Sequence, residues 1–186
     1  MDKFKDIKRG NLLIAEPSIL DDEEFNRSVI LISEHNKNGT VGFILNKPTD
    51  HTINELIPEI DSDHITYSGG PVAEDNLYFV HTVPELIPNS ELISGNIYWA
   101  GDFNIVKDLL NEGKINKNQI RFFLGYSGWS NNQLKEELAQ TSWIIKKNTV
   151  KNLFSINTLS FWKKELLKIG GDYKIWANAP KDPKLN

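Results

Sequence analysis

Residues 27–46 read RSVILISEHNKNGTVGFILN, and this stretch decides the first part of the fold. Its four consecutive apolar residues, Val29–Ile32, are typical of a strand that is covered on both faces. Asn36–Gly39 then supplies residues that tolerate positive φ, which a hairpin turn needs. Residues 40–46 form the return strand. The stretch therefore predicts a β-hairpin.

Shorter patterns on either side of the hairpin predict a domain of many small elements. Further strands are expected at residues 11–16, 64–67, 76–82, 96–100, 119–125 and 142–146. Helices are expected to begin near Thr52, Asp102, Ser130 and Thr158, where capping residues precede apolar positions at helical spacing. Hairpin-connected strands come first and strand–helix units follow, so the fold class is α+β with a mixed sheet.

The length and composition favour one ordinary globular domain over residues 1–186. The chain has 186 residues, of which 25% are charged, and it contains no cysteine. The lack of cysteine excludes disulfides, zinc ribbons, iron–sulfur clusters and a thiol nucleophile. No apolar run approaches the roughly 20 residues that a membrane span needs. The first residues lack a signal-peptide pattern, so a cytoplasmic protein is expected.

Charge is divided unevenly along the chain. Residues 1–143 hold 12 Lys and Arg against 22 Asp and Glu, a formal charge of −10, whereas residues 144–186 carry +6. Residues 1–143 are called the body below. Because the body is strongly acidic, it repels the phosphates of nucleic acids, and direct DNA binding is not expected. The basic end could still bind nucleic acid through Lys146, Lys147, Lys151, Lys163, Lys164 and Lys168. We favour packing on the acidic body, because this end also carries core-type aromatic residues such as Phe154, Phe161, Trp162 and Trp176.

Gly125-Tyr126-Ser127-Gly128-Trp129 is the segment that most resembles a catalytic motif. It follows a predicted buried strand and precedes a capped helix, as a nucleophile elbow of the form G-x-S-x-G does. Here Trp129 replaces the final glycine, and all four histidines precede Ser127, the reverse of the hydrolase order. Catalysis by Ser127 with His81 or Asp102 therefore stays an alternative. The favoured interpretation is a tight turn whose N–H groups face a cleft.

Three glycine-containing segments at predicted strand ends form the candidate ligand surface. Its residues are Ser68, Gly69, Gly70, Gly101, Asp102, Tyr126, Ser127, Gly128 and Trp129. Their unpaired N–H groups could converge on a ligand, with Tyr126 and Trp129 available for stacking. The glycines of residues 68–71 equally suit a structural turn. No histidine has metal-ligand spacing, and no cofactor motif is present, so neither a metal nor a cofactor is expected.

Taken in order, several motifs resemble the YqgE/AlgH family of bacterial proteins. They are GNLLIAEP at residues 10–17, FNRSV at 25–29, EH at 34–35, GTVGFILNKP at 39–48, GGPV at 69–72, GD at 101–102 and GYSGW at 125–129, with QL at 133–134, EL at 137–138 and Trp143. Ser130 and Asn131 depart from the Gly and Pro often found after the tryptophan. The resemblance implies a single domain with a core at 10–146, a basic helical extension at 147–186, and a coiled, barrel-like mixed sheet flanked by helices. It implies no established reaction, cofactor or catalytic residues.

These observations predict a non-enzymatic module that binds a protein or a small molecule. The family resemblance adds a role in regulating gene expression, which would be indirect because the chain has no recognition helix with a basic face. The two alternatives are a hydrolase or transferase that uses Ser127, and a nucleic-acid-binding protein that uses the basic end. The sequence does not identify the partner or the oligomeric state.

Overall fold

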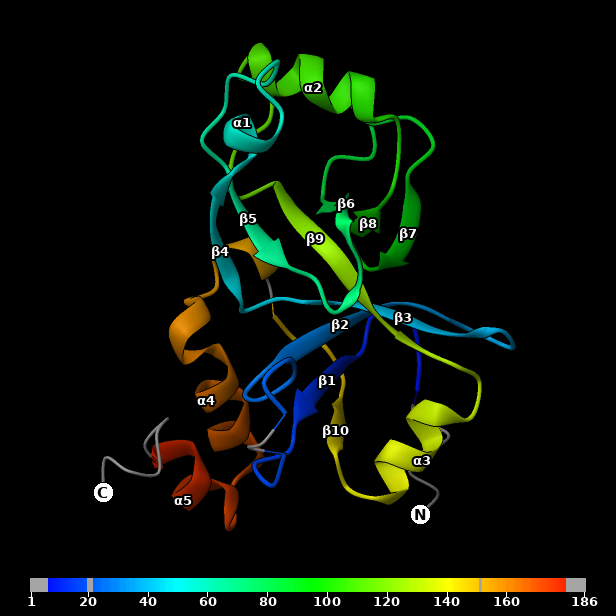
Figure 1. Cartoon of the computed structure of the whole chain (residues 1–186), viewed down its shortest axis with the longest axis vertical. Coiled ribbons are helices and arrows are strands. Elements are labelled where there is room, and N and C mark those ends of the chain that lie inside the picture. Colours follow the sequence, from blue (N-terminus) through cyan, green and yellow to red (C-terminus); the bar gives the residue numbers. More distant parts are fainter. Residues whose placement is uncertain (1–6, 20–21, 151, 180–186) are drawn as a thin grey trace.

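A computed structural model describes residues 7–19, 22–150 and 152–179, which form one sheet with helices at both ends (Figure 1). The strands are β1 (Leu12–Ala15), β2 (Val29–Asn36), β3 (Gly39–Ile44), β4 (Pro48–Thr52), β5 (Ile65–Ser68), β6 (Val72–His81), β7 (Glu91–Ser94), β8 (Ile97–Trp99), β9 (Ile120–Trp129) and β10 (Trp143–Lys146). The helices are α1 (Ile53–Leu56), α2 (Phe103–Asn111), α3 (Gln133–Ala139), α4 (Thr158–Ile169) and α5 (Tyr173–Asn178), with a 3₁₀ turn, η2, at Leu153–Ser155.

The sheet is mixed and open. Its strands follow the order β10-β1-β2-β3-β9-β6-β8-β7, and β4 joins through β5, which pairs with β9. The β5–β9 pair is parallel, and the other pairs are antiparallel. The α+β class and the mixed sheet are confirmed. The expected barrel-like closure is wrong, because the two end strands, β10 and β7, do not pair with each other in the described chain.

The expected turn at residues 125–129 is instead the second half of strand β9. This strand changes partners along its length: Ile120–Leu124 pairs with β5 and β6, whereas Ser127 pairs with Gly42 of β3. Gly125 lies at the change with φ of 68°, a conformation that glycine adopts without strain. A Cβ on Gly125 would lie 2.5 Å from the carbonyl oxygen of Gly70. The glycine therefore serves a bend in a strand that crosses the whole sheet.

Local signals placed the hairpin and the starts of α1, α2 and α4 correctly, whereas α3 begins at Gln133 after Asn132 and not with a cap at Ser130. The hairpin is β2–β3, with Asn36 opposite Gly39 across the turn. Asp102 caps α2, because its Oδ1 accepts the N–H of Asn104 at 2.9 Å. The N–H of Thr52 donates to Glu55 Oε2 at 2.8 Å, which is half of a capping box. Strands β4 and β7 and helix α5 were not predicted, because they are short and lack a clear apolar period.

The buried apolar residues form two separate cores. The larger contains β1, β2 and β3 together with Phe161, Trp162 and Leu166 from the chain's end. The smaller lies under α1 and α2, around Ile53, Phe122 and other buried side chains. No helix in the described parts of the chain is long and apolar enough to cross a membrane.

The basic extension is part of the larger core. Phe154, Phe161, Trp162 and Leu166 are each at most 6% exposed. The indole N–H of Trp162 donates to the Ala15 carbonyl at 2.8 Å, and η2 is held through its Phe154 carbonyl, which accepts from Arg121 at 2.9 Å. Apolar packing and hydrogen bonds therefore attach the extension to the body.

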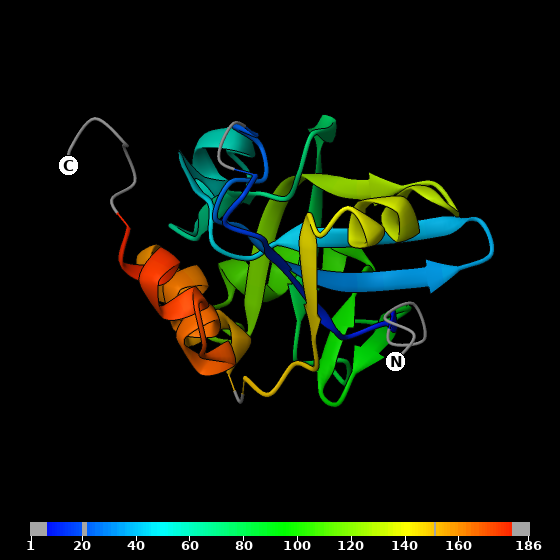
Figure 2. The same cartoon turned by 90° about the horizontal axis from the view of Figure 1, so that it is seen from below.

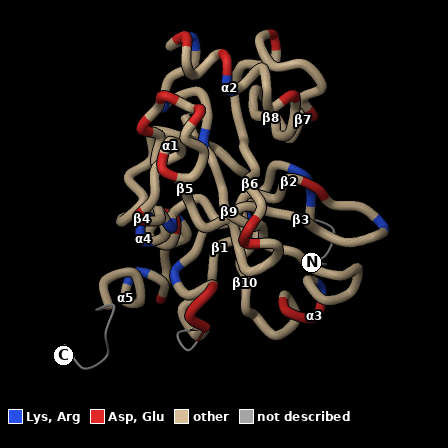
Figure 3. Tube along the Cα trace, turned by 45° about the horizontal axis from the view of Figure 1, so that its top comes forward, with Lys and Arg blue, Asp and Glu red and all other residues tan. Residues whose placement is uncertain are grey.

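Ion pairs do not make the contact between the acidic body and the basic end in the described chain. Figure 3 shows Lys positions along α4 and α5 and acidic positions over the body's loops and α3. The ion pairs of the basic end lie within residues 144–186: the buried Glu165 of α4 pairs with Lys146 of β10 at 2.8 Å and with Lys168. Burial alone raises the pKa of Glu165, but hydrogen bonds to the two lysines outweigh this and hold the pKa below its usual range. No described lysine of the extension pairs with a carboxylate of the body.

Candidate functional site

Strand β10 lies at an edge of the sheet. Every second residue of the strand directs its main-chain N–H and C=O groups away from the neighbouring strand β1. The N–H of Glu16 donates to the Ser142 carbonyl at 3.0 Å, which makes residues 16 and 142 a hydrogen-bonded pair. The antiparallel register then alternates, so Ile144 and Lys146 face β1, whereas Trp143 and Ile145 direct their N–H and C=O groups outward. In the described chain no other strand pairs with β10. Figure 2 shows this edge between α3 and the pair α4 and α5.

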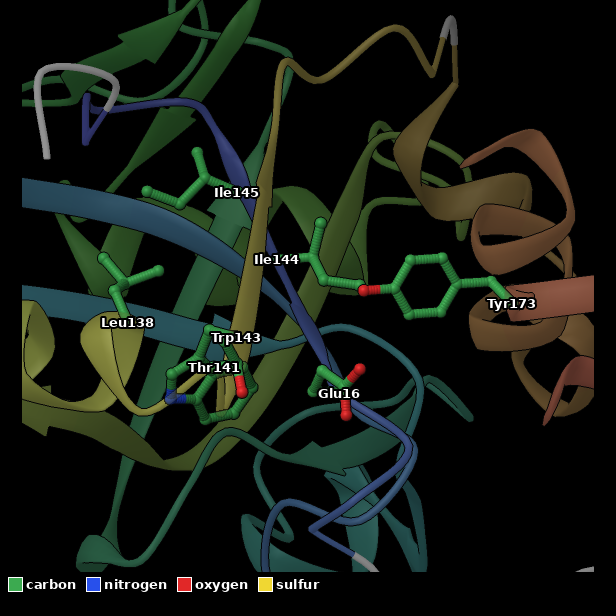
Figure 4. A pocket seen from close by; sticks show the side chains of 7 residues that line it. All are labelled: Glu16, Leu138, Thr141, Trp143, Ile144, Ile145 and Tyr173. Carbon is green, nitrogen blue, oxygen red and sulfur yellow. The ribbon is translucent and has the colours of Figure 1, made fainter. Parts of the chain in front are cut away.

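A groove follows the free edge of β10. Its cavity measures about 200 Å³ and is lined by Glu16, Leu138, Thr141, Trp143, Ile144, Ile145 and Tyr173, which together are called the β10 groove below. Figure 4 shows Leu138, Trp143 and Ile145 on one side of the strand and Ile144 and Tyr173 on the other, with the Glu16 carboxylate at one end. Side chains from both faces of a strand can line one cavity only at an unpaired edge. The cavity and the outward main-chain groups therefore form one site.

The β10 groove continues past Glu16 and Tyr173 into a wider hollow of about 510 Å³. This hollow is lined by Ile169, Gly170, Gly171, Asp172 and Trp176 besides the two shared residues. Among the described residues, no Lys or Arg lines either cavity, whereas two carboxylates do. Burial raises the pKa of Tyr173, and the negative charge of Glu16 and a hydrogen bond to it raise that pKa further. The floor is therefore apolar and one end is acidic.

Trp129, Trp143 and Glu137 form a hydrogen-bonded cluster, called the tryptophan clasp below, that holds α3 at one wall of the β10 groove. The indole N–H groups of Trp129 and Trp143 both donate to Glu137 Oε2, at 2.8 and 2.7 Å. The two rings meet edge to face with centroids 5.9 Å apart, and Phe25 packs against both. Buried indole N–H groups need acceptors, and one carboxylate on α3 supplies both. The clasp therefore fixes α3 against β9 and β10.

The structure brings together two of the three segments of the predicted ligand surface. Ser127 is fully buried, and its Oγ donates to the Gly69 carbonyl at 3.0 Å. Gly70 packs so closely on Ser127 that a Cβ there would lie 2.4 Å from Oγ. These contacts close the space between the segments of residues 68–70 and 125–129. A shallow hollow nearby is lined by Tyr126, Gly128 and Trp129, but not by Ser68, Gly69, Gly70 or Ser127.

The third segment lies elsewhere. Gly101 and Asp102 open α2, where Gly101 packs against Ile87 and Pro88. His81 Nε2 lies 2.9 Å from Ser90 Oγ, and His81 pairs with Ile120 at the opposite end of β9 from Ser127. A seven-residue separation along a strand corresponds to roughly 20 Å. Ser127, His81 and Asp102 therefore do not form a triad.

Among the remaining predicted groups, Lys147, Lys163 and Lys164 are exposed, so nucleic-acid binding through them stays a prediction. Lys146 and Lys168 share Glu165, and Lys151 is outside the described residues. His81 is fully buried, and burial lowers its pKa to about 4, against opposing contributions from the Ala100 carbonyl and Glu85. Among the described residues, no group of three His, Asp or Glu side chains could hold a metal ion.

Sequence reasoning did not find the β10 groove. Residues 142–146 were predicted as a strand, but nothing in a single strand's pattern shows whether it lies at an edge. Tyr173 and Glu16 are 157 positions apart and meet only because the extension packs beside β1. The one local signal was the apolar run Trp143–Ile145. Both faces of this strand are apolar, and among the described strands it pairs with β1 alone.

The whole chain has clear relatives. The sequence model of a family described as AlgH-like matches residues 12–174. A UPF0301 protein of Cytophaga hutchinsonii is 43% identical over 182 residues, which covers 97% of this chain and 100% of that protein. One from Parabacteroides distasonis is 40% identical over 181 residues, 96% of this chain and 91% of that protein.

Two solved structures share the fold. A crystal structure of a protein from Corynebacterium diphtheriae matches with a TM-score of 0.75 at 22% identity, over 93% of each chain. The solution structure of AlgH from Pseudomonas aeruginosa matches with a TM-score of 0.71 at 24% identity, over 92% of this chain and 94% of that one.

Proposed function

The chain belongs to the AlgH-like family, and we propose that it is a protein-binding module whose β10 groove receives an extended segment of a partner protein. The observation that carries the proposal is the outward direction of the N–H and C=O groups of Trp143 and Ile145 beside an apolar cavity. An extended peptide can pair with both residues and so add a strand to the sheet.

The elongated outline of the site favours an extended peptide. The cavity of the β10 groove measures about 200 Å³, which suits one or two apolar side chains of an added strand. The adjoining hollow of about 510 Å³ offers room for the residues that follow. Main-chain pairing would supply affinity, and the cavity would select the side chain that enters it.

The charges around the groove favour a segment with a basic residue beside its apolar one. Glu16 lies at the end of the cavity, and Asp172 lines the adjoining hollow. One oxygen of the Glu16 carboxylate already has partners, because Oε2 accepts hydrogen bonds from the N–H and Oγ of Ser18 at 2.9 and 2.7 Å. A Lys or Arg of the partner would complete the pairing of these carboxylates.

The burial of Ser127 does not suit a catalytic nucleophile, which supports a binding function for the protein. A nucleophile must reach both a base and the substrate, whereas Ser127 Oγ is fully buried and donates to a carbonyl. Any effect of the protein on gene expression would then pass through the partner that it holds.

The test uses a probe peptide and a variant that removes one outward N–H. The probe is the acetylated, amidated hexapeptide Thr-Val-Ile-Val-Lys-Thr, titrated against the full chain by calorimetry. Ile145→Pro deletes the outward N–H without breaking the ladder to β1, because proline is tolerated on the open side of an edge strand. We expect it to weaken binding about tenfold or more. Ile145→Val keeps the N–H and is the matched control.

Two outcomes would overturn the proposal. One is a peptide affinity that Ile145→Pro and Ile145→Val change equally, or no saturable binding at all. The other is dimerisation of the free protein that Ile145→Pro abolishes, measured by analytical ultracentrifugation, because a second copy would then occupy the edge.

A further inference from the structure

A second cavity, of about 140 Å³, lies between β5, β9, the loop that precedes β9, and η2. It shares no residue with the β10 groove. Its polar and aromatic lining consists of His64, Tyr67, Lys117, Asn118, Arg121 and Phe154. Two of these residues carry positive charge, and no carboxylate lines the cavity in the described chain.

Arg121 places an uncompensated positive charge in the wall. Its side chain is buried, at 4% exposure, with the guanidinium carbon 4.1 Å from the centre of the Tyr67 ring. Two of its five N–H groups donate to the carbonyls of Leu45 and Phe154, at 2.7 and 2.9 Å. Among the described residues, no carboxylate lies within 4.0 Å of it. Such a buried charge is costly unless an anion accompanies it.

His64 contributes an imidazole ring to the wall. The residue is 6% exposed, and its Nδ1 lies 2.6 Å from Ser62 Oγ. Burial lowers the pKa of His64, whereas the main chain of Asn116, acting as an acceptor for the ring, opposes this. The ring therefore has local partners and shapes the cavity, and no donor for a ligand is assigned to it.

Lys117 and Asn118 add donors at the rim. Lys117 Nζ lies 2.7 Å from Asp63, but both side chains are more than half exposed, so this pair is weak. Asn118 Oδ1 accepts from Ser155 Oγ at 2.8 Å, so its amide nitrogen is directed elsewhere and can donate. Lys117, Asn118 and Arg121 therefore offer hydrogen-bond donors from one stretch of the chain, at the start of β9.

We propose that this cavity binds the phosphate group of a small molecule. Its donors are the guanidinium of Arg121, the ammonium of Lys117 and the side-chain amide of Asn118. A phosphate has three or four oxygens and can accept from all three groups at once, whereas a carboxylate has two oxygens in one plane. The phosphate would neutralise Arg121.

The experiment titrates inorganic phosphate into the full chain at constant ionic strength, set with sodium chloride. The readout is the NMR resonances of the His64 ring and of the Arg121 side chain. We expect saturable shifts of both. Lys117→Gln, at the exposed rim, should raise the dissociation constant about tenfold. Lys114→Gln is the matched control, since Lys114 lies in the same loop but pairs with Glu112 outside the cavity; it should change the constant less than twofold.

Three results would overturn the inference. They are shifts that do not saturate with phosphate, equal effects of Lys117→Gln and Lys114→Gln, and binding of acetate in place of phosphate under the same conditions. The measurement does not depend on the β10 groove, so an Ile145→Pro variant should bind phosphate as the native chain does. Failure of the peptide proposal and failure of this one are therefore distinguishable.

Discussion

The indole N–H of Trp162 donates to the carbonyl of Ala15 at 2.8 Å, and so joins α4 to the end of β1. Both residues are buried, at 4% and 0% exposure. The next residue after Ala15 is Glu16, which lines the β10 groove. This contact makes the basic extension one wall of the groove, so the stability of the extension and the shape of the candidate site depend on each other.

Removing this hydrogen bond should destabilise the whole domain. Trp162→Phe leaves the ring's packing largely intact but deprives the buried Ala15 carbonyl of its donor, which costs about 1–3 kcal/mol. Urea unfolding should remain a single transition with a lower midpoint. Trp176→Phe, about half exposed, is the control and should change stability by less than about 0.5 kcal/mol. Separate unfolding of α4 before the body would contradict this account.

The tryptophan clasp predicts a large effect from one carboxylate. Glu137→Ala leaves two buried indole N–H groups without an acceptor, so we expect a loss of about 2–4 kcal/mol and a changed tryptophan fluorescence. Glu137→Gln keeps one acceptor oxygen and should fall between this variant and the native chain. Glu136→Ala, exposed on the same helix, is the comparison. Equal stability of the two alanine variants would show that the clasp is not what holds α3.

Ser127 should matter to packing and not to chemistry. Ser127→Ala removes the donor to the Gly69 carbonyl and should cost about 1–2 kcal/mol, with peptide binding unchanged. Gly70→Ala should cost more, because its Cβ would lie 2.5 Å from the Ser127 main-chain nitrogen and its φ is 142°. Stabilities are measured by urea unfolding, and binding by the hexapeptide titration. Loss of peptide binding in a folded Ser127→Ala protein would refute this assignment.

Acidification should destabilise the protein through His81. The unfolded chain takes up this proton near pH 6.5, whereas burial lowers the pKa in the folded protein to about 4. The unfolded state therefore binds more protons between these values, so stability falls as the pH drops from about 6.5 to 4, by on the order of 3 kcal/mol.

The variant His81→Gln isolates this contribution. Its free energy of unfolding should depend less steeply on pH between 6 and 4.5 than that of the native chain. His51→Gln, at a side chain that is 59% exposed, should keep the native slope. Identical slopes for the native chain and His81→Gln would show that another group causes the acid sensitivity.

Features with a local cause were predictable from the sequence, and features that depend on distant partners were not. The hairpin over residues 27–46 and the cap at Asp102 each arise within a few residues. Residues 125–129 were predicted to form a turn. Gly125 does have the positive φ typical of turns, but in the structure this conformation bends strand β9. No pattern within residues 142–146 shows that β10 pairs with β1 alone among the described strands.

The candidate site illustrates the same limit. Gly69 and Gly70 lie against Ser127, and their close contact fills the space where a ligand was expected. The β10 groove arises where the extension returns to β1, a contact between residues 147 positions apart. The aromatic residues of the extension predicted that it packs on the body. Phe154, Phe161 and Trp162 are indeed buried, whereas Trp176 is about half exposed.

Amide hydrogen exchange along β10 tests the central claim most directly. In the free protein, the N–H of Ile145 should exchange faster than those of Ile144 and Lys146, which face β1. Saturation with the hexapeptide should slow exchange at Ile145 at least tenfold and leave Ile144 nearly unchanged. An Ile145 amide that is already protected in the free protein, or that exchanges equally fast with the peptide bound, would contradict the account.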